Sequence, residues 1–215
     1  MSAIKKALSQ LLVELPEKVT LVAVSKTKPA TAIVEAYSYG QRDFGENKVQ
    51  ELVEKWETLP KDINWHMIGH LQRNKVKYIA PFVHLIHGID SLRLLEEVNR
   101  QGAKIGRKIA VLLQVHIAEE ETKFGLDTSE LETIFSLLHT LNHVEVKGLM
   151  GMATFTSNQD QIRSEFNHLK KLFDSFQSSF SPPPILSMGM SGAYQIALEE
   201  GSTLIRIGSS LFGSR

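Results

Sequence analysis

Short apolar runs alternate with longer amphipathic segments along the whole chain. The runs are rich in valine, isoleucine and leucine, which favours buried strands. We expect strands at 19–24, 42–44, 64–68, 83–86, 108–115, 144–148, 185–187 and 203–207. The segments between them place apolar residues at helical spacing and predict helices over 1–15, 30–38, 48–58, 91–102, 129–141, 160–178 and 192–199.

Strands that are separated by helices of this length indicate βαβ units and a parallel sheet. Eight candidate strands favour a single α/β domain over residues 1–215, a (β/α)₈ TIM-type barrel with an extra N-terminal helix. An open doubly wound sheet is the competing architecture, but no Gly-x-Gly-x-x-Gly sequence follows the first strand. We expect Pro29 to open a helix, and Gly102 and Gly201 to end helices.

Charge and cysteine content narrow the range of functions. The 24 basic and 24 acidic side chains cancel, so the chain has no general attraction for nucleic acid or anionic lipid. Cysteine is absent, which excludes disulfides, thiolate metal sites and cysteine nucleophiles. No apolar run approaches the roughly 18 residues of a membrane span. We therefore expect a cytoplasmic monomer without nucleic-acid or membrane partners.

Eight histidines raise the question of a metal site. His66 and His70 are four residues apart, but His66 belongs to a strand pattern, where this spacing does not place two side chains on one face. His84 and His87 have Asp90 as their nearest carboxylate partner in sequence. No His-Glu-x-x-His motif is present. We expect no metal site.

Lys26 is the most informative residue for chemistry. Side chains alternate along a strand, so Val22, Val24 and Lys26 share one face. If that face lines the barrel, Lys26 projects into the mouth at the C-terminal end, where barrel active sites lie. The residue is either a solvated lysine at the start of a loop, or a desolvated lysine whose lowered pKa leaves a neutral amine to attack an aldehyde. Lys28 is the weaker candidate because it stands two residues farther out, before Pro29.

Two glycine-containing turns follow the last two expected strands. In the first, Ser191 stands at an expected helix N-cap, and Gly192 lets a bound group approach the backbone. In the second, Gly208 follows a strand and Ser209 opens a short helix. Backbone N–H groups in such turns favour anions, and two of these turns after the last strands form the usual phosphate site of this barrel. Helix capping alone is the alternative role for Ser191.

Arg206 lies inside the last apolar run, between two isoleucines. Its side chain must point into the barrel or extend outward along aliphatic neighbours. The inward orientation would place a permanently charged donor near a ligand held by Gly208 and Ser209. Glu46 and Asn74 belong to turns after two earlier strands and could line the same mouth, but we expect them to cap helices.

Six motifs occur in order along the chain: Ala-Val-Ser-Lys-Thr-Lys-Pro at 23–29, Phe-Gly-Glu-Asn at 44–47, Ile-Gly-x-Leu-Gln-x-Asn-Lys at 68–75, Gly-Leu-Met at 148–150, Ser-Met-Gly-Met-Ser at 187–191 and Arg-Ile-Gly-Ser at 206–209. In this combination the chain resembles the pyridoxal phosphate homeostasis proteins. The resemblance implies a single (β/α)₈ domain like the N-terminal domain of alanine racemase, with pyridoxal 5′-phosphate (PLP) as its cofactor.

The same resemblance implies roles for individual residues. Lys26 would carry PLP as an aldimine, Arg206 would face the pyridine nitrogen, and Asn47 would lie near the cofactor. The residues expected to hold the phosphate are Ser191, Gly192, Gly208 and Ser209. One departure from the family is Ala193, where an acidic residue is common. Its absence removes a negative charge near the phosphate, so we expect phosphate binding to be kept and no acid–base role at this position.

The expected function is to bind PLP and to buffer or deliver it, with effects on amino-acid and vitamin B6 balance and with PLP-dependent apo-enzymes as recipients. Racemisation needs two opposed acid–base groups. Alanine racemase takes one of them from a second domain, and we expect none after Arg215. An arginine opposite the pyridine nitrogen also leaves that nitrogen unprotonated and a poor electron sink. The alternatives are a single-domain PLP-dependent racemase, a Schiff-base lyase that uses Lys26, or a protein-interaction regulator.

Overall fold

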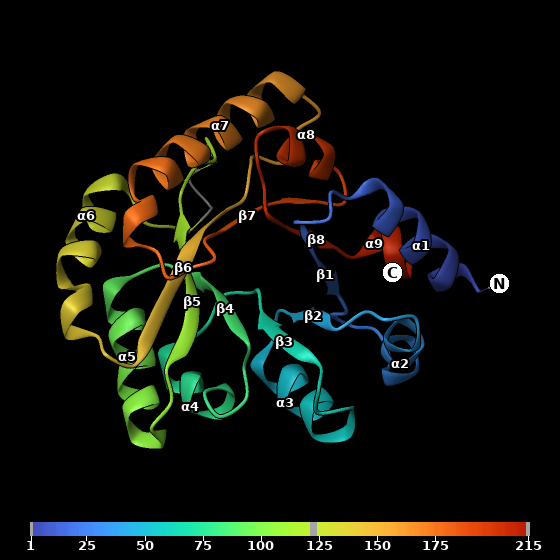
Figure 1. Ribbon diagram of the computed structural model, residues 1–215, viewed down its shortest axis with the longest axis horizontal. Helices are drawn as coiled ribbons and strands as arrows, with labels where there is room; N and C mark the ends of the chain where they lie inside the picture. Colours follow the sequence, from blue (N-terminus) through green and yellow to red (C-terminus); the bar gives the residue numbers. More distant parts are fainter. Residues whose placement is uncertain (1, 121–123, 214–215) are drawn as a thin grey trace.

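The computed structural model describes residues 2–120 and 124–213 of the chain. In this part, eight parallel strands form a closed barrel in which each strand pairs with the next, and β8 pairs with β1 (Figure 1). The expected (β/α)₈ barrel is thereby confirmed. The strands are β1 (Thr20–Val24), β2 (Asp43–Glu46), β3 (Asn64–Met67), β4 (Leu85–Ile89), β5 (Ile109–Val115), β6 (Val144–Gly151), β7 (Ile185–Met190) and β8 (Leu204–Ile207).

Helices surround the barrel on the outside (Figure 1). They are α1 (Ala3–Glu14), α2 (Ala30–Ser38), α3 (Val49–Thr58), α4 (Val76–Ile79), α5 (Leu92–Ile105), α6 (Thr128–Leu137), α7 (Gln159–Ser175), α8 (Tyr194–Glu199) and α9 (Ser209–Phe212), with 3₁₀ turns at Arg73–Lys75, Leu138–Thr140 and Gln177–Ser179. The expected N-terminal helix is α1, which contacts both α2 and α9. The two ends of the described chain therefore lie side by side.

Local side-chain chemistry sets where several helices begin. Ser2, Asp127 and Asn158 each accept a hydrogen bond from a backbone N–H of the first helical turn, which satisfies a donor that has no partner inside the helix. Pro29 stands at the N-cap of α2, one position before the helix. The short α4 was not expected from the sequence, because a single turn shows no helical period.

Two glycines that we expected to end helices behave differently. Gly201 follows α8 with φ 88°, as a helix terminator should. The expectation for Gly102 is wrong, since α5 continues to Ile105 and ends at Gly106 with φ 64°. Gly102 is buried within the helix, where an added Cβ would lie 2.6 Å from the carbonyl oxygen of Arg107. Close packing, not helix termination, requires glycine there.

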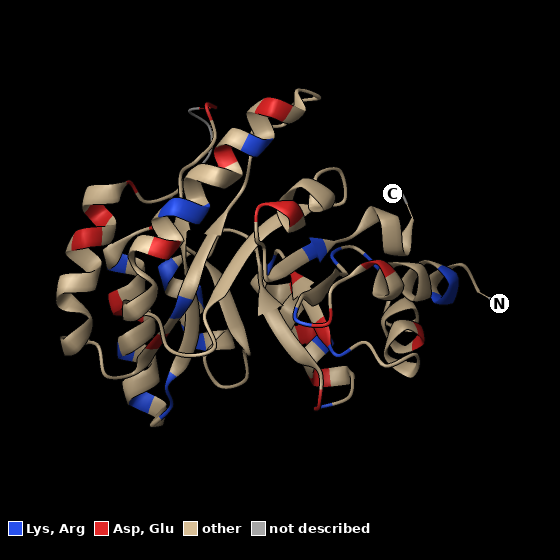
Figure 2. Ribbon diagram, turned by 45° about the horizontal axis from the view of Figure 1, so that its top comes forward, with Lys and Arg blue, Asp and Glu red and all other residues tan. Residues whose placement is uncertain are grey.

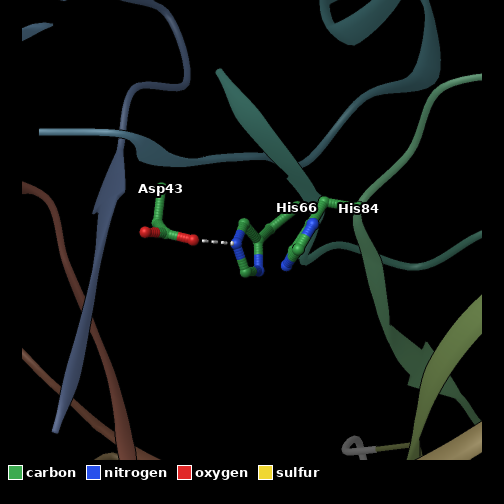
Figure 3. Close-up of side chains that lie close together, drawn as sticks. All are labelled: Asp43, His66 and His84. Atoms are coloured by element: carbon green, nitrogen blue, oxygen red, sulfur yellow. Dashed lines mark hydrogen bonds and ion pairs between the residues drawn. The ribbon is translucent and has the colours of Figure 1, made fainter. Parts of the chain in front are cut away.

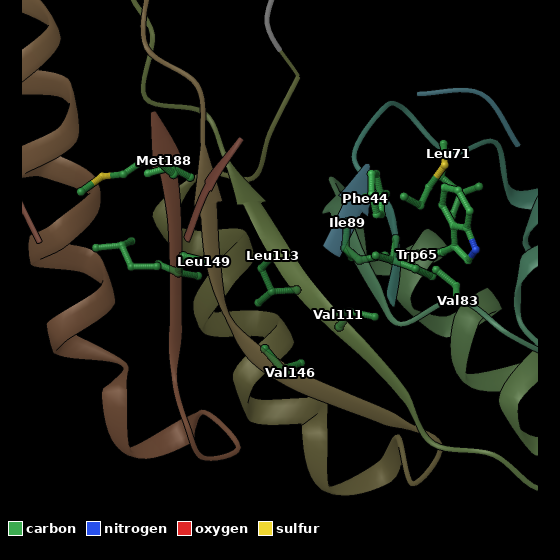
Figure 4. Close-up of a cluster of buried hydrophobic side chains, with 14 of the residues drawn as sticks. Phe44, Trp65, Leu71, Val83, Ile89, Val111, Leu113, Val146, Leu149 and Met188 are labelled. Atoms are coloured by element: carbon green, nitrogen blue, oxygen red, sulfur yellow. The ribbon is translucent and has the colours of Figure 1, made fainter. Parts of the chain in front are cut away.

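The apolar core has two parts. The larger part lies between the helices and the outer face of the strands; Phe44 and Trp65 lie at one side of it, beside Leu71 and Val83, and Leu149 and Met188 lie at the other side (Figure 4). A smaller cluster fills the barrel interior, and its buried members are Val22, Leu85, Leu112, Met150 and Leu204. Val22 thus points inward, as the alternation in the first strand predicted.

Charged residues of both signs are spread over the molecule, although α6 carries acidic residues alone (Figure 2). This distribution agrees with the balanced composition. Among the described helices, none combines the length and the apolar character that a membrane crossing requires.

Candidate functional site

A cavity of about 450 Å³ opens at the C-terminal ends of β1, β6, β7 and β8. Its volume falls within the range of about 300–1,000 Å³ that is usual for small-molecule sites. The site residues expected from the sequence that line it are Lys26, Ser191, Gly192, Arg206, Gly208 and Ser209. Residues that follow the first strand and residues that follow the last two strands therefore meet at one mouth of the barrel.

Lys26 is held in a tight turn at the end of β1. The N–H of Lys28 donates to the carbonyl of Ser25 at 3.0 Å, which closes the turn. Thr27 adopts φ 64°, in the left-handed region that a β-branched residue rarely occupies. Such a backbone costs about 1–3 kcal/mol and persists only where its surroundings impose it. The turn thus presents Lys26, which is half-buried, to the cavity in one fixed backbone geometry.

Three charged side chains behind the turn hold it in place. Lys55 Nζ donates to the carbonyl of Ser25 at 2.8 Å, to Glu46 Oε1 at 2.8 Å and to Glu51 Oε1 at 2.7 Å. Glu51 also accepts from the N–H of Thr27 at 2.7 Å. Glu46 accepts from the hydroxyl of Ser25 at 2.6 Å. Side chains of β2 and α3 therefore fix the backbone on both sides of Lys26.

The two carboxylates of this network are shifted in opposite directions. Burial raises the pKa of Glu46, which is fully buried, although the bonds from Lys55 and Ser25 oppose the shift. At Glu51, partial burial is outweighed by the bonds from Lys55 and from the N–H of Thr27, so its pKa is lowered. The expectation that Glu46 caps a helix is wrong, because α3 has no side-chain cap and Glu46 points to Lys55 and Ser25.

Asn74 does not cap a helix either. It lies in the middle of the 3₁₀ turn Arg73–Lys75, and no side-chain cap bond is present at this turn or at α4. The residue is exposed and does not line the cavity.

The turn after β7 differs in detail from the sequence expectation. Ser191 is not the N-cap of α8, because the helix begins after Ala193, which has no capping side chain. Instead, the hydroxyl of Ser191 accepts a hydrogen bond from the N–H of Gly208 at 3.3 Å. This contact joins the turn after β7 to the turn after β8. Within the described residues, the N–H groups of Gly192 and Ser209 have no hydrogen-bond acceptor.

Arg206 points into the barrel. It is 4% exposed, and its Nη2 donates to the carbonyl of Gly151 at 3.1 Å. Among the described residues, Arg206 Nε has no hydrogen-bond partner although it is buried. Burial lowers the pKa of Arg206 to about 10, which still leaves the guanidinium charged at neutral pH. A buried, charged donor at the cavity wall therefore lacks an acceptor.

Asn47 is the expected site residue that the structure does not bring to this cavity. It follows β2, and its backbone packs so closely on Gly69 that a Cβ on Gly69 would lie 2.4 Å from the Asn47 carbonyl oxygen. Ala193 does line the cavity. The position where an acid was expected from the resemblance is thus at the site and carries no charge.

A chain of polar side chains inside the barrel was missed at the sequence level. His66 Nε2 lies 3.0 Å from Asp43 Oδ1, and His66 Nδ1 lies 2.9 Å from His87 Nε2. His87 Nδ1 is in turn 3.4 Å from the hydroxyl of Ser187. His84 completes a cluster with Asp43 and His66 (Figure 3). Sequence spacing did not predict this cluster, because neighbouring strands bring together residues that are not adjacent in sequence.

Comparison with known proteins connects this geometry to a family. The family model for the N-terminal domain of alanine racemase matches residues 1–215. A pyridoxal phosphate homeostasis protein from Aquifex aeolicus is 41% identical over 197 residues, which cover 91% of this chain and 86% of that protein. The chain belongs to the pyridoxal phosphate homeostasis protein family. The counterpart from Escherichia coli strain K12 is 36% identical over 204 residues, covering 93% of this chain and 87% of its own length.

Solved structures agree with this family membership. PipY from Synechococcus elongatus, solved without PLP, is 37% identical and superposes with a TM-score of 0.92 over 98% of this chain and all of its own. PipY has also been solved with PLP bound, and that structure gives a TM-score of 0.88. Alanine racemase from Bartonella henselae is 18% identical, with a TM-score of 0.78, and this chain covers 58% of it. That likeness shows a shared barrel fold.

Proposed function

We propose that this member of the pyridoxal phosphate homeostasis family binds PLP through a Schiff base with Lys26 and acts as a carrier or regulator of the cofactor. The observation that carries the proposal is the pairing of Lys26 with the unpartnered Nε of Arg206 across one cavity. An amine at one wall and a buried donor at another match the aldehyde and the ring nitrogen of PLP. PLP is bound in the PipY structure, which this chain resembles over nearly its whole length.

The remaining polar groups of the cavity fit the phosphate. The N–H groups of Gly192 and Ser209 have no acceptor within the described residues, and both residues line the cavity. Glycine at 192 leaves open space, since a Cβ there would meet no atom within 4 Å. An anion can therefore approach these amides closely. The bond between Ser191 and Gly208 holds the two turns at a fixed separation.

Arg206 limits the chemistry that this site supports. When PLP is bound, its conjugated ring supplies an electron sink, and the strength of that sink depends on protonation of the ring nitrogen. A guanidinium only donates hydrogen bonds and stays charged at neutral pH. Arg206 would therefore hold the ring nitrogen as an acceptor and keep it unprotonated. Storage and release of PLP are favoured over rapid amino-acid turnover, and PLP-dependent apo-enzymes are the natural recipients.

Two measurements test this function. The absorbance spectrum of purified protein should show a Schiff-base band that borohydride removes, and a Lys26→Ala variant should lack it, whereas Lys48→Ala should keep it. The loaded protein is then incubated with L-alanine and other amino acids, and D-isomers and keto acids are followed by chiral chromatography. We expect negligible product. Turnover at ~1 s⁻¹ or faster would show a racemase or transaminase instead, and absence of the band from the PLP-loaded protein would refute the Schiff base with Lys26.

A further inference from the structure

A second polar site lies at the opposite, N-terminal end of the barrel. Asp43 begins β2, His66 lies within β3, and His84 directly precedes β4. One ligand atom from each residue lies within 4.8 Å of the other two (Figure 3). We propose that these three side chains bind a divalent transition-metal ion, with Zn²⁺ as the best match, and that a water molecule completes the coordination.

The ligand set and its spacing favour Zn²⁺. Two imidazoles and one carboxylate are usual Zn²⁺ ligands at about 2.0–2.2 Å, whereas Mg²⁺ and Ca²⁺ prefer oxygen. At these metal–ligand distances, two ligand atoms of a tetrahedral site lie about 3.3 Å from each other. Asp43 Oδ1 and His66 Nε2 are 3.0 Å apart, so small side-chain shifts suffice. Asp43 and His84 are the partly exposed members, and they can adjust around the buried His66.

The surroundings of the two outer ligands leave a path for a cation. Asp43 supplies a carboxylate oxygen and His84 an imidazole nitrogen, and neither residue is buried, so an ion can reach both from solvent. Two cations whose charges act on His84 are Arg107 and Lys147. Arg107 donates to the carbonyls of Ala80 and Val83, and Lys147 pairs with Glu145 at 3.0 Å.

The buried chain behind His66 allows this residue to accept a metal. In one hydrogen-bond direction, the hydroxyl of Ser187 donates to His87 Nδ1, and His87 Nε2 donates to His66 Nδ1. His66 Nε2 then donates to Asp43 Oδ1. In the reverse direction, His66 Nδ1 donates to His87 Nε2, and His87 Nδ1 donates to the hydroxyl of Ser187. Each group carries the same number of protons in both arrangements, because neutral imidazoles and hydroxyls both donate and accept. The reversal exposes the lone pair of His66 Nε2 without any net gain or loss of protons.

In that reversed state, His87 serves as the outer partner that orients a metal-bound histidine. His87 is fully buried, and its distances of 2.9 Å to His66 and 3.4 Å to Ser187 are already set by β3, β4 and β7. Partners of this kind typically change metal affinity about 10–100-fold when removed. Bound metal would link β2, β3 and the segment before β4 at the end of the barrel away from Lys26.

Co²⁺ binding to the full, untagged protein tests the proposal, because tetrahedral Co²⁺ is visible by its absorbance and Zn²⁺ should displace it. We expect one ion per chain and a higher thermal midpoint in the presence of Zn²⁺. His84→Ala and Asp43→Asn alter partly exposed side chains and should each weaken binding by about 100-fold or more, since losing a ligand costs more than losing an outer partner. His139→Ala, at an exposed histidine of the 3₁₀ turn Leu138–Thr140, is the matched control and should bind normally.

Two further variants separate this site from the cofactor site. Lys26→Ala should retain Co²⁺ binding, which shows that the ion is not held by PLP. His87→Phe should weaken binding about 10–100-fold while the protein stays folded by circular dichroism. The proposal is overturned if no saturable Co²⁺ binding occurs, if His84→Ala and Asp43→Asn bind as tightly as the wild type, or if Lys26→Ala abolishes binding.

Discussion

The two ends of the barrel use different means to build a polar site. At the C-terminal mouth, the groups that face the cavity are backbone amides of glycine turns, one lysine on a strained turn and one buried arginine. Toward the N-terminal end, four side chains from β2, β3, β4 and β7 form a continuous chain through the interior. The mouth is open for a ligand, whereas the interior chain is already paired. Changes at the mouth should therefore weaken PLP binding, whereas loss of His87 from the interior chain should lower stability and leave PLP binding intact.

The largest effect on stability is expected for His87→Ala. This change leaves a cavity in the barrel and removes the partner of His66 Nδ1, so the free energy of unfolding should fall by about 2–4 kcal/mol. Urea denaturation measures the loss, with His139→Ala as the control. The PLP spectrum of the folded variant should be unchanged. A stability equal to that of the wild type would show that the interior chain does not support the fold.

Gly189→Ala should displace the backbone of the turn after β7, which lines the cavity. Gly189 adopts φ 89°, and an added Cβ would lie 2.5 Å from the Cβ of Ala197. We expect a loss of about 1–3 kcal/mol in unfolding free energy, together with weaker PLP binding because the turn after β7 is displaced. Urea denaturation and PLP titration follow the two effects. Normal PLP affinity in this variant would mean that the β7 turn does not hold the cofactor.

The contributions of Glu46 and Glu51, the two carboxylates behind Lys26, to stability should change with pH in opposite directions. Because the pKa of Glu46 is raised in the folded state, the stability of the wild type relative to Glu46→Gln should decline as pH rises through that pKa. The pKa of Glu51 is lowered in the folded state, so the wild type should be more stable than Glu51→Gln at pH values above the pKa that Glu51 has in the unfolded chain. This advantage should be lost as pH falls through the pKa of Glu51 in the folded state. Urea denaturation between about pH 4 and pH 8 resolves the two slopes. Slopes of the same sign would contradict the burial assigned to Glu46.

The smallest structural effect is expected for Gly192→Ala. No atom lies within 4 Å of the added methyl group, so the free energy of unfolding should stay within ~0.5 kcal/mol of the wild type. The methyl group would occupy space next to the amide that we assign to the phosphate, and PLP affinity should fall about tenfold, or ~1.4 kcal/mol. An unchanged affinity would place the phosphate elsewhere in the cavity.

The same contrast explains what the sequence could predict. Lys26, Gly192, Gly208 and Ser209 stand directly after apolar runs, and the C-terminal ends of parallel strands meet at one mouth, so local pattern and barrel topology were enough to bring them together. The inward orientation of Arg206 could not be decided from its isoleucine neighbours. It follows from the closure of β8 on β1, where Arg206 pairs with Val22 of the inner face.

The interior chain depends on contacts that no local pattern records. His87 and Ser187 are 100 positions apart in the sequence. His66 and His87 belong to the neighbouring strands β3 and β4, and the sequence pattern revealed only the apolar residues of these strands, not the pairing of their polar side chains. The expected fourth strand stopped at residue 86 because His87 and Gly88 interrupt that run, yet β4 continues to Ile89. Lys55 and Glu46 were missed as a pair for a similar reason, since a lysine on an amphipathic helix is usually solvated and this one is buried against β2.

Peptide mapping after borohydride reduction tests the assignment of Lys26 most directly. The PLP-loaded protein is reduced and digested, and the peptides are sequenced by mass spectrometry, with Lys28→Ala and Lys26→Ala treated in parallel. We predict one reduced PLP adduct on Lys26 in the wild type and in Lys28→Ala, and none in Lys26→Ala. An adduct on Lys28 or Lys75, or one that survives in Lys26→Ala, would contradict the site that the β1 turn and the Arg206 wall define.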